Sequence, residues 1–262
     1  MGRRLLIDRR ILLTGASSGI GRALARQLAP LQTHLLLLAR REQPLNELAV
    51  EVKKLGAASA EPIVGDVTDI ELHSALVQRI RADWGGLDLL INNAGVSSHG
   101  RFDGNSPEVL RQIMEVNFFA ATELTRAALP LLAAGEDPLL VNIGSILGHR
   151  GVPYNSEYCA SKFALRGWSE AIRPELQRER IGLLLVSPGT TNTEFFEHLI
   201  AKREKLPWGN QKGLPAEKVA AQIVRAIECR RHEVYPNWRG RFLVLLNRLS
   251  PRLVDRVMNR YS

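Results

Sequence analysis

Cysteine is scarce in this chain, which has only Cys159 and Cys229 among its 262 residues. Two cysteines cannot form the disulfide framework of a small secreted domain, and their spacing matches no metal site. We therefore expect two free thiols in a reducing compartment, and no bound metal.

Long hydrophobic runs are also missing. No stretch approaches the roughly 18 apolar residues that mark a membrane-spanning helix. The first ten residues, MGRRLLIDRR, contain an apolar run of only three, which is too short for a secretory signal peptide. We expect a cytoplasmic protein.

Acidic residues are few near the C-terminus. From Arg225 to Ser262 there are nine arginines, no lysine and three acidic residues, so this segment carries +6 of the total net charge of +8. The preceding residues carry only +2, and a nearly neutral body argues against a nucleic-acid-binding surface. We expect no nucleic-acid partner.

Short apolar runs alternate along the chain with longer helical patterns. Strands are predicted at 9–14, 34–39, 61–65, up to Asn92, up to about Ser145, at 181–189 and at 232–235, and helices at 42–55, 69–84, 107–134, 155–179 and 215–229. This alternation predicts an α/β fold with a doubly wound parallel sheet of the Rossmann type, flanked by helices, in a single domain. We expect residues 1–237 to form a cofactor-binding and catalytic domain, and 238–262 to be a basic amphipathic extension of it.

A glycine-rich segment, TGASSGIG from Thr14 to Gly21, lies where the first strand meets a helix. Glycines there let the main chain turn tightly and approach a pyrophosphate, and the helix N-terminus adds free N–H donors. The segment therefore predicts a dinucleotide site.

Tyr158 and Lys162 stand four residues apart in a predicted helix, which brings their side chains to one face. A neighbouring positive charge favours the phenolate and lowers the pKa of a tyrosine, as an acid/base at an alcohol or carbonyl requires. Taken alone, such a pair is more often a solvated surface contact.

Together these motifs resemble the short-chain dehydrogenase/reductase family of about 250 residues. The resemblance extends from residue 9 to about 193 and rests on TGxxxGxG, Asp66-Val67, Asn92-Asn93-Ala94-Gly95 and YxxxK. It implies cofactor contacts from Gly15, Ser17, Ser18, Gly19, Ile20, Gly21, Asp66, Val67, Asn93, Ala94, Gly95, Tyr158, Lys162, Pro188, Gly189 and Thr193.

The same resemblance implies a catalytic set of Asn117, Ser145, Tyr158 and Lys162. Tyr158 would exchange a proton with the substrate oxygen, and Ser145 would hydrogen-bond that oxygen. Lys162 would hold the nicotinamide ribose and lower the pKa of Tyr158, and Asn117 would anchor a water through a local helix distortion.

The second predicted strand ends in Ala39-Arg40-Arg41, where an NAD site normally has an acidic residue for the ribose hydroxyl. Two guanidinium groups can instead clamp a 2′-phosphate. We therefore predict NADP in preference to NAD, with Arg40 the first candidate and Arg41 the second.

The loop after Thr193 is rich in apolar side chains: Phe195, Phe196, Leu199, Ile200, Leu206 and Trp208. A loop of this kind suits a hydrophobic carbonyl or alcohol substrate, although these side chains could equally pack the loop down. His149, Val152 and Tyr154 are further candidates for the pocket wall. The helices 107–134 and 155–179 are where members of this family pair, so we expect a homodimer or homotetramer.

The arginine-rich tail predicts two short amphipathic helices separated by Pro251, with Leu246, Leu249, Leu253 and Val257 at helical spacing. Packing over the substrate pocket or against another subunit is the favoured interpretation, and attachment to an anionic membrane surface is the alternative. Alternatives for the whole chain are a catalytically silent NADP(H)-binding scaffold or redox sensor, or a membrane-docked module. A sugar-nucleotide epimerase is disfavoured by the short chain.

Overall fold

The computed structural model describes residues 2–202 and 213–260. Within them, a seven-stranded sheet has the order β11-β7-β6-β4-β1-β2-β3, with all neighbours parallel. The predicted doubly wound sheet is confirmed, and its strand order reverses between β1 and β4. The seven strands are β1 Arg10–Thr14, β2 His34–Ala39, β3 Ser59–Val64, β4 Leu89–Asn92, β6 Leu139–Ile143, β7 Gly182–Val186 and β11 Glu233–Val234.

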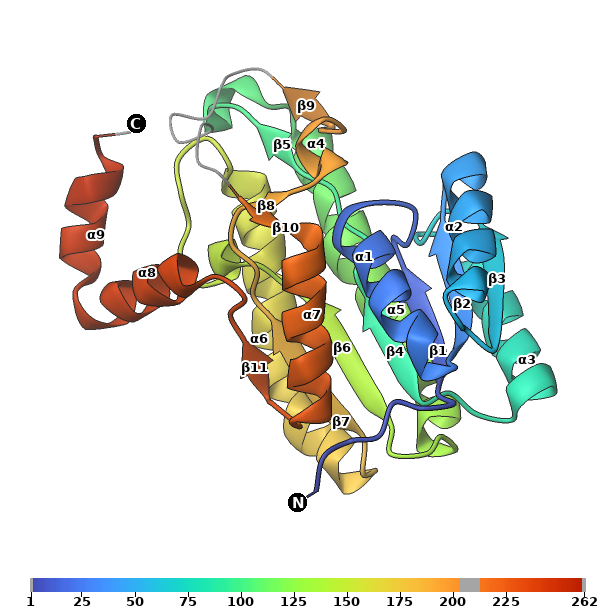
Figure 1. Cartoon of the computed structure of the whole chain (residues 1–262). Coiled ribbons are helices and arrows are strands. Elements are labelled where there is room, and N and C mark those ends of the chain that lie inside the picture. Colours follow the sequence, from blue (N-terminus) through green and yellow to red (C-terminus); the bar gives the residue numbers. More distant parts are fainter. Residues whose placement is uncertain (1, 203–212, 261–262) are drawn as a thin grey trace.

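Helices cover both faces of this sheet (Figure 1). They are α1 Gly19–Leu28, α2 Glu42–Lys54, α3 Ile70–Trp84, α4 Pro107–Met114, α5 Ala120–Ala133, α6 Ser156–Arg178, α7 Ala216–Glu228, α8 Trp238–Leu249 and α9 Pro251–Met258. One apolar layer joins the sheet to α1, α2 and α7, and the other joins it to α3, α5 and α6. Successive strand side chains enter opposite layers, so Ile11 and Leu13 belong to the first layer and Leu12 to the second. Burial on both faces explains why the strands read as continuous apolar runs.

The segment predicted as one helix from Pro107 to Ala134 is interrupted. α4 ends at Met114, Glu115–Phe119 form a π-helical turn, η3, and α5 then continues to Ala133. Asn117 lies in this π-turn, which is the kind of helix distortion that the family resemblance implied. A π-turn adds a residue to the helical repeat and is frequent at functional sites.

Two short strand pairs stand outside the main sheet. β5 (Ser98–His99) pairs with β9 (Ala201–Lys202), and β8 (Thr191–Asn192) pairs with β10 (Leu214–Pro215). Both pairs lie beyond the carboxyl ends of the main strands (Figure 1).

The tail forms the two predicted helices, α8 and α9, which extend to one side of the domain (Figure 1). Of the residues expected on their apolar face, Leu246 is half-buried, whereas Leu249, Leu253 and Val257 are 76%, 44% and 39% exposed. The buried side chains are instead Val244 and Val254. The spacing in steps of three and four therefore predicted the helices but not which of their side chains are buried.

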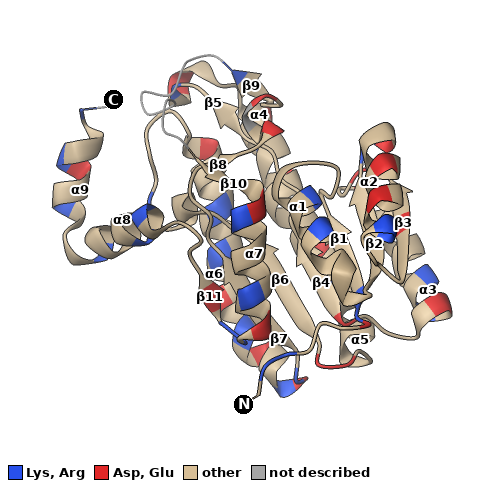
Figure 2. Cartoon of the chain, in the orientation of Figure 1, with Lys and Arg blue, Asp and Glu red and all other residues tan. Residues whose placement is uncertain are grey.

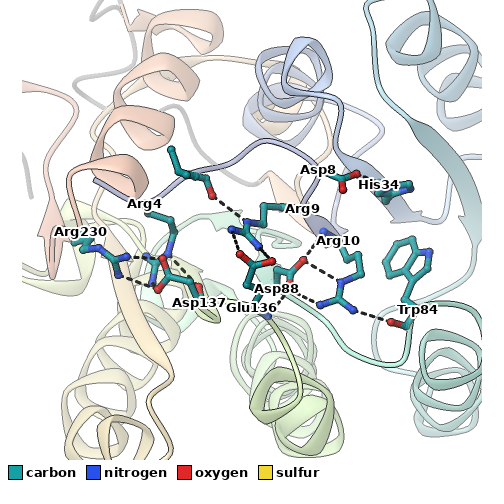
Figure 3. A network of polar contacts seen from close by, with 11 residues as sticks. Arg4, Asp8, Arg9, Arg10, His34, Trp84, Asp88, Glu136, Asp137 and Arg230 are labelled. Carbon is teal, nitrogen blue, oxygen red and sulfur yellow. Dashed lines mark hydrogen bonds and ion pairs between the residues drawn. The ribbon is translucent and has the colours of Figure 1, made fainter. Parts of the chain in front are cut away.

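A cluster of ion pairs lies at the amino ends of β1 and β4 (Figure 3). Asp88, only 1% exposed, accepts hydrogen bonds from the Arg10 main chain (2.8 Å) and guanidinium (2.6 and 3.0 Å), and from the Glu136 main chain (2.7 Å). Burial alone would raise the pKa of Asp88, but these hydrogen bonds outweigh it and hold the pKa below its ordinary value. Asp137 binds both Arg4 (3.0 Å) and Arg230 (2.5 and 2.8 Å), so it ties the N-terminal segment to the end of α7.

Candidate active site

A cleft of about 1540 Å³ opens at the carboxyl ends of the strands, where the strand order reverses. Ligands of doubly wound sheets bind at this position. Nearly all of the predicted site residues line it: Gly15, Ser17, Ser18, Gly19, Ile20, Arg40, Arg41, Asp66, Val67, Asn93, Ala94, Gly95, Ser145, Tyr158, Lys162, Pro188, Gly189 and Thr193. Gly21 and Asn117 do not line it, and both lie behind its wall.

The glycine loop has a shape that only glycine permits. Gly15 and Gly19 adopt positive φ angles of 64° and 52°. A Cβ atom at Gly21 would stand 2.3 Å from the Gly15 carbonyl oxygen. The side chain of Ser18, the N-cap residue of α1, makes no capping hydrogen bond, so it does not occupy the N–H donors of the first turn. A cradle of this form fits a pyrophosphate, as a dinucleotide cofactor would supply.

Asn93 fixes this loop from the next strand. Its side-chain amide donates to the main-chain oxygens of Thr14 (2.9 Å) and Gly15 (3.0 Å). The Thr14 hydroxyl in turn accepts from the main-chain N–H groups of Asn93 and Ala94, both at 3.0 Å. The glycine loop and the NNAG segment are therefore hydrogen-bonded to each other, and the Asn93 amide holds the loop in place.

The two arginines after β2 lie at the outer end of the cleft. Arg40 is 63% exposed and forms a long ion pair of 3.7 Å with Asp66. Arg41 pairs with Glu194 at 3.0 Å and also reaches the Ser17 hydroxyl at 3.4 Å. The contact with Glu194 could not be predicted from the sequence, because 153 residues separate the partners. Arg40 is thus the more accessible cation at this end.

Tyr158 and Lys162 face one another from successive turns of α6, as predicted. The Lys162 nitrogen stands 5.6 Å from the centre of the Tyr158 ring and donates to the carbonyl oxygen of Ile143 at 2.9 Å. Ser145 follows β6 directly, and its hydroxyl hydrogen-bonds the Tyr158 phenol. Phe195 covers the phenol ring edge-on, at 5.9 Å between ring centres.

The pKa values of this pair are set mainly by burial. Burial raises the pKa of Tyr158 well above its ordinary value, and the hydrogen bond with Ser145 opposes this only in part. The protein's own groups therefore do not produce the lowered tyrosine pKa that we predicted. Burial lowers the pKa of Lys162 to about 8, because a charged amine loses its hydration there.

Asn117 lies outside the cleft lining, next to Gly95 and Lys162. It is 1% exposed, and its amide oxygen accepts from the Val96 main chain at 2.8 Å. A Cβ atom at Gly95 would stand 3.2 Å from that oxygen and 3.7 Å from the Lys162 nitrogen. Only the main chain of Gly95 therefore lies between the side chains of Asn117 and Lys162.

Several lining residues were missed by the sequence reasoning. Asn155, 2% exposed, donates to the Ser98 carbonyl at 3.0 Å and lines the cleft one turn before Tyr158. The other missed lining residues include Ser97, His99, Lys202, Leu243, Val257 and Met258. Ser97 and His99 follow the NNAG segment directly, which was a usable signal. Packing of the tail over the pocket was one of the two arrangements predicted, but the sequence did not indicate which tail residues would line the cleft.

Of the other pocket candidates, Val152 lines the cleft, whereas His149 is turned away. His149 is buried against Ser187 (2.9 Å) and Glu233 (3.2 Å). Tyr154 is not among the lining residues. Of the predicted apolar loop, Leu206 and Trp208 lie outside the described residues.

Comparison with known proteins agrees with this geometry. Residues 9–204 match the family model described as short chain dehydrogenase. The chain belongs to the short-chain dehydrogenase/reductase family, and it is an oxidoreductase that uses a nicotinamide cofactor. 

Individual relatives span nearly the whole chain. An uncharacterized oxidoreductase, YxnA of Bacillus subtilis (strain 168), is 34% identical over 97% of this chain and 72% of that protein. Hydroxysteroid 11-beta-dehydrogenase 1-like protein B of Xenopus laevis is 31% identical over 99% of this chain and 89% of its own. The crystal structure of a short chain dehydrogenase/reductase from Burkholderia phymatum in complex with NAD has a TM-score of 0.86 and 25% identity, covering 95% of this chain and 96% of that chain. 

No helix in residues 2–202 and 213–260 combines the length and the apolar character needed to cross a bilayer.

Proposed function

We propose that this protein interconverts a carbonyl and a secondary alcohol on a hydrophobic small molecule, with NADP(H) as cofactor and Tyr158 as general acid/base. The observation that carries the proposal is the meeting of Ser145, Tyr158 and Lys162 at one end of the cleft that also contains the glycine loop. The supporting residues come from β6, α6 and the β1–α1 turn, so only the folded sheet brings them together.

Each side chain has a distinct part in the proposed reaction. The bound cofactor would supply or accept the hydride. The Tyr158 hydroxyl would donate its proton to the carbonyl oxygen in reduction, or accept it in oxidation, while Ser145 hydrogen-bonds the same oxygen and orients it. Lys162 would hold the cofactor ribose. Burial raises the pKa of Tyr158, so proton exchange at neutral pH would rely on the cationic Lys162 and the cationic oxidised nicotinamide to lower it.

The cofactor contacts are proposed residue by residue. The pyrophosphate would lie on the loop from Gly15 to Gly21, the adenine beside Asp66 and Val67, and the carboxamide beside Thr193. Preference for NADP rests on Arg40 and then Arg41, since both line the outer end of the cleft and no carboxylate occupies the position after β2. The Burkholderia relative was solved with NAD, which supports a nicotinamide cofactor without deciding between the two.

We also propose a homodimer or homotetramer, with pairing through α4–α5 and α6. Within each chain we propose a domain of residues 1–237 and an extension of residues 238–262.

The exposed apolar residues Trp238, Phe242, Leu245 and Leu249 alternate on the tail with arginines (Figure 2), which supports peripheral contact with an anionic membrane as an additional role. Such contact would be compatible with a cytoplasmic enzyme.

The test is an assay of NADPH consumption against a panel of ketones, aldehydes, quinones and steroid-like carbonyls. We expect turnover with apolar carbonyls, and its loss in Tyr158→Phe with NADPH binding intact. If the Phe variant retained activity, Tyr158 would not be the acid. Tight NADPH binding without turnover on any compound would favour the alternative of a silent cofactor-binding scaffold or redox sensor.

A further inference from the structure

The tail packs directly on the loop that carries Ser145. Residues Ile146–Gly148 form the 3-10 turn η4 immediately after that serine. A Cβ atom at Gly240, in α8, would stand 2.7 Å from the Ile146 side chain, so glycine is what allows α8 to lie this close. Val244 of α8 and Val254 of α9 are buried, at 4% and 1% exposure. The α8–α9 hairpin is therefore in contact with the protein body at the catalytic end.

Arg150 connects this loop to both helices of the hairpin. Its guanidinium donates to the Asn247 side chain of α8 at 3.2 Å and to the Asp255 carboxylate of α9 at 2.6 Å. Asn247 in turn donates to the main-chain oxygen of His149 at 3.3 Å. The side chain of Arg150 is 17% exposed and that of Asp255 55%, so Arg150 is mostly enclosed between the loop and the two helices.

The hairpin also contributes to the cleft itself. Leu243 of α8, and Val257 and Met258 at the end of α9, line the same cleft as Ser145 and Tyr158. All three side chains are apolar, and methionine adapts its shape to different ligands. The cofactor half of the cleft is built by other segments, namely the glycine loop and the ends of β2 to β4.

We propose that Arg150 is a positioning residue that holds the α8–α9 hairpin in place, so that Leu243, Val257 and Met258 form the apolar far wall of the substrate site. This inference rests on the proposed function and specifies its substrate class: carbonyl compounds with an apolar body long enough to reach that wall. Short substrates contact only the region of Ser145 and Tyr158 and do not depend on Arg150.

The experiment compares Arg150→Ala, Asp255→Asn and the double variant in the full chain, with Arg252→Ala as a control that removes an exposed arginine from the same hairpin. The substrates are a series of unbranched methyl ketones of increasing chain length. We expect each single variant to raise KM for the longest ketone about fivefold, which corresponds to about 1 kcal/mol for a partly exposed ion pair. KM for the shortest ketone and the dissociation constant of NADPH stay unchanged.

The double variant should show no larger change than Arg150→Ala alone, because the two residues act through one contact. A KM change equal for short and long ketones, or a full additive effect, would overturn the proposal.

A second measurement does not require turnover. Limited trypsin digestion should cut the tail at Arg248, Arg252 or Arg256 faster in Arg150→Ala and Asp255→Asn than in the wild type. Equal cleavage rates would overturn the proposed role of Arg150 in holding α8 and α9. Faster cleavage in a protein that reduces no carbonyl would support that role. It would refute the substrate wall and, separately, the proposed function.

Discussion

The Asn117 side chain donates a buried hydrogen bond of 2.9 Å to the Ser161 hydroxyl. Asn117 belongs to the π-turn between α4 and α5, and Ser161 precedes Lys162 in α6. Since Asn117 also exchanges hydrogen bonds with both main-chain groups of Val96, it fixes three segments to one another. The position of Lys162 is thus determined by a residue that does not itself line the cleft.

The buried amine of Lys162 is expected to reduce the stability of the fold. Its pKa in the folded protein is about 8, below the ordinary 10.5, so the unfolded chain binds a proton more readily between these values. By linkage, stability should rise with pH across this window, and the full penalty applies below it. The free energy of unfolding of Lys162→Met should then be about 2 kcal/mol higher than that of the wild type near pH 7, after allowing for the lost hydrogen bond to Ile143.

Urea unfolding at about pH 7 and about pH 9.5 would measure this difference, which should shrink at the higher pH. Lys53→Met, at an exposed site near the end of α2, is the matched control and should change little. A Lys162→Met protein less stable than the wild type at both pH values would contradict the prediction. Turnover should be lost in either case.

Arg40→Asp should reverse the cofactor preference. It replaces an exposed cation at the outer end of the cleft by a carboxylate that repels a 2′-phosphate and can accept a ribose hydroxyl. We expect kcat/KM with NADPH to fall by roughly 10- to 100-fold, while the value with NADH stays level or rises. Arg225→Asp, at an exposed site in α7 and away from the cleft, serves as the control for altered net charge. An unchanged NADPH/NADH ratio in Arg40→Asp would transfer the assignment to Arg41.

Gly21→Ala should weaken cofactor binding without unfolding the domain. The added methyl group would meet the Gly15 carbonyl oxygen at 2.3 Å and the Asn93 amide at 2.6 Å, which forces the loop to shift. Overpacking of this kind costs about 1–3 kcal/mol, so the dissociation constant of NADPH should rise about tenfold or more. Fluorescence titration of NADPH measures it. Gly167→Ala, in the exposed part of α6 with open space around its Cβ position, should bind NADPH as the wild type does.

Asp88→Ala should strongly destabilise the fold while leaving the cleft intact. The substitution leaves Arg10 and two main-chain N–H groups without their acceptor, and the loss of one member of a buried pair costs about 3 kcal/mol. Because the pKa of Asp88 and that of Asp137 are lowered in the folded protein, their contribution is present at neutral pH and is lost as the pH falls through the acidic range.

Urea unfolding of Asp88→Ala at neutral and acidic pH tests both parts of this prediction. The control is Asp103→Asn, because Asp103 pairs with Arg101 at 3.0 Å where both side chains are exposed, by 68% and 63%. If Asp103→Asn lost as much stability as Asp88→Ala, burial would not be the cause.

The sequence predicted the five inner strands β1, β2, β4, β6 and β7 well because they are apolar on both faces, whereas the edge strands β3 and β11 are only partly buried. The cleft residues followed from motifs with fixed spacing. What it could not predict were contacts that depend on tertiary packing, such as Asn117 with Ser161, Arg41 with Glu194, or the arrival of Leu243 and Met258 at the cleft. For the tail, the two helices and packing over the pocket were predicted, but the spacing of Leu249 and Leu253 did not identify which side chains are buried. 

The ion pairs of Asp137 have a consequence for kinetics. Asp137 joins Arg4 to Arg230, which lie near opposite ends of the chain, so both contacts require the sheet and α7 to be assembled first. Interactions that form after the folding transition state slow unfolding and have little effect on folding. We expect these pairs to govern the lifetime of the folded molecule, at the end of the sheet farthest from the cleft.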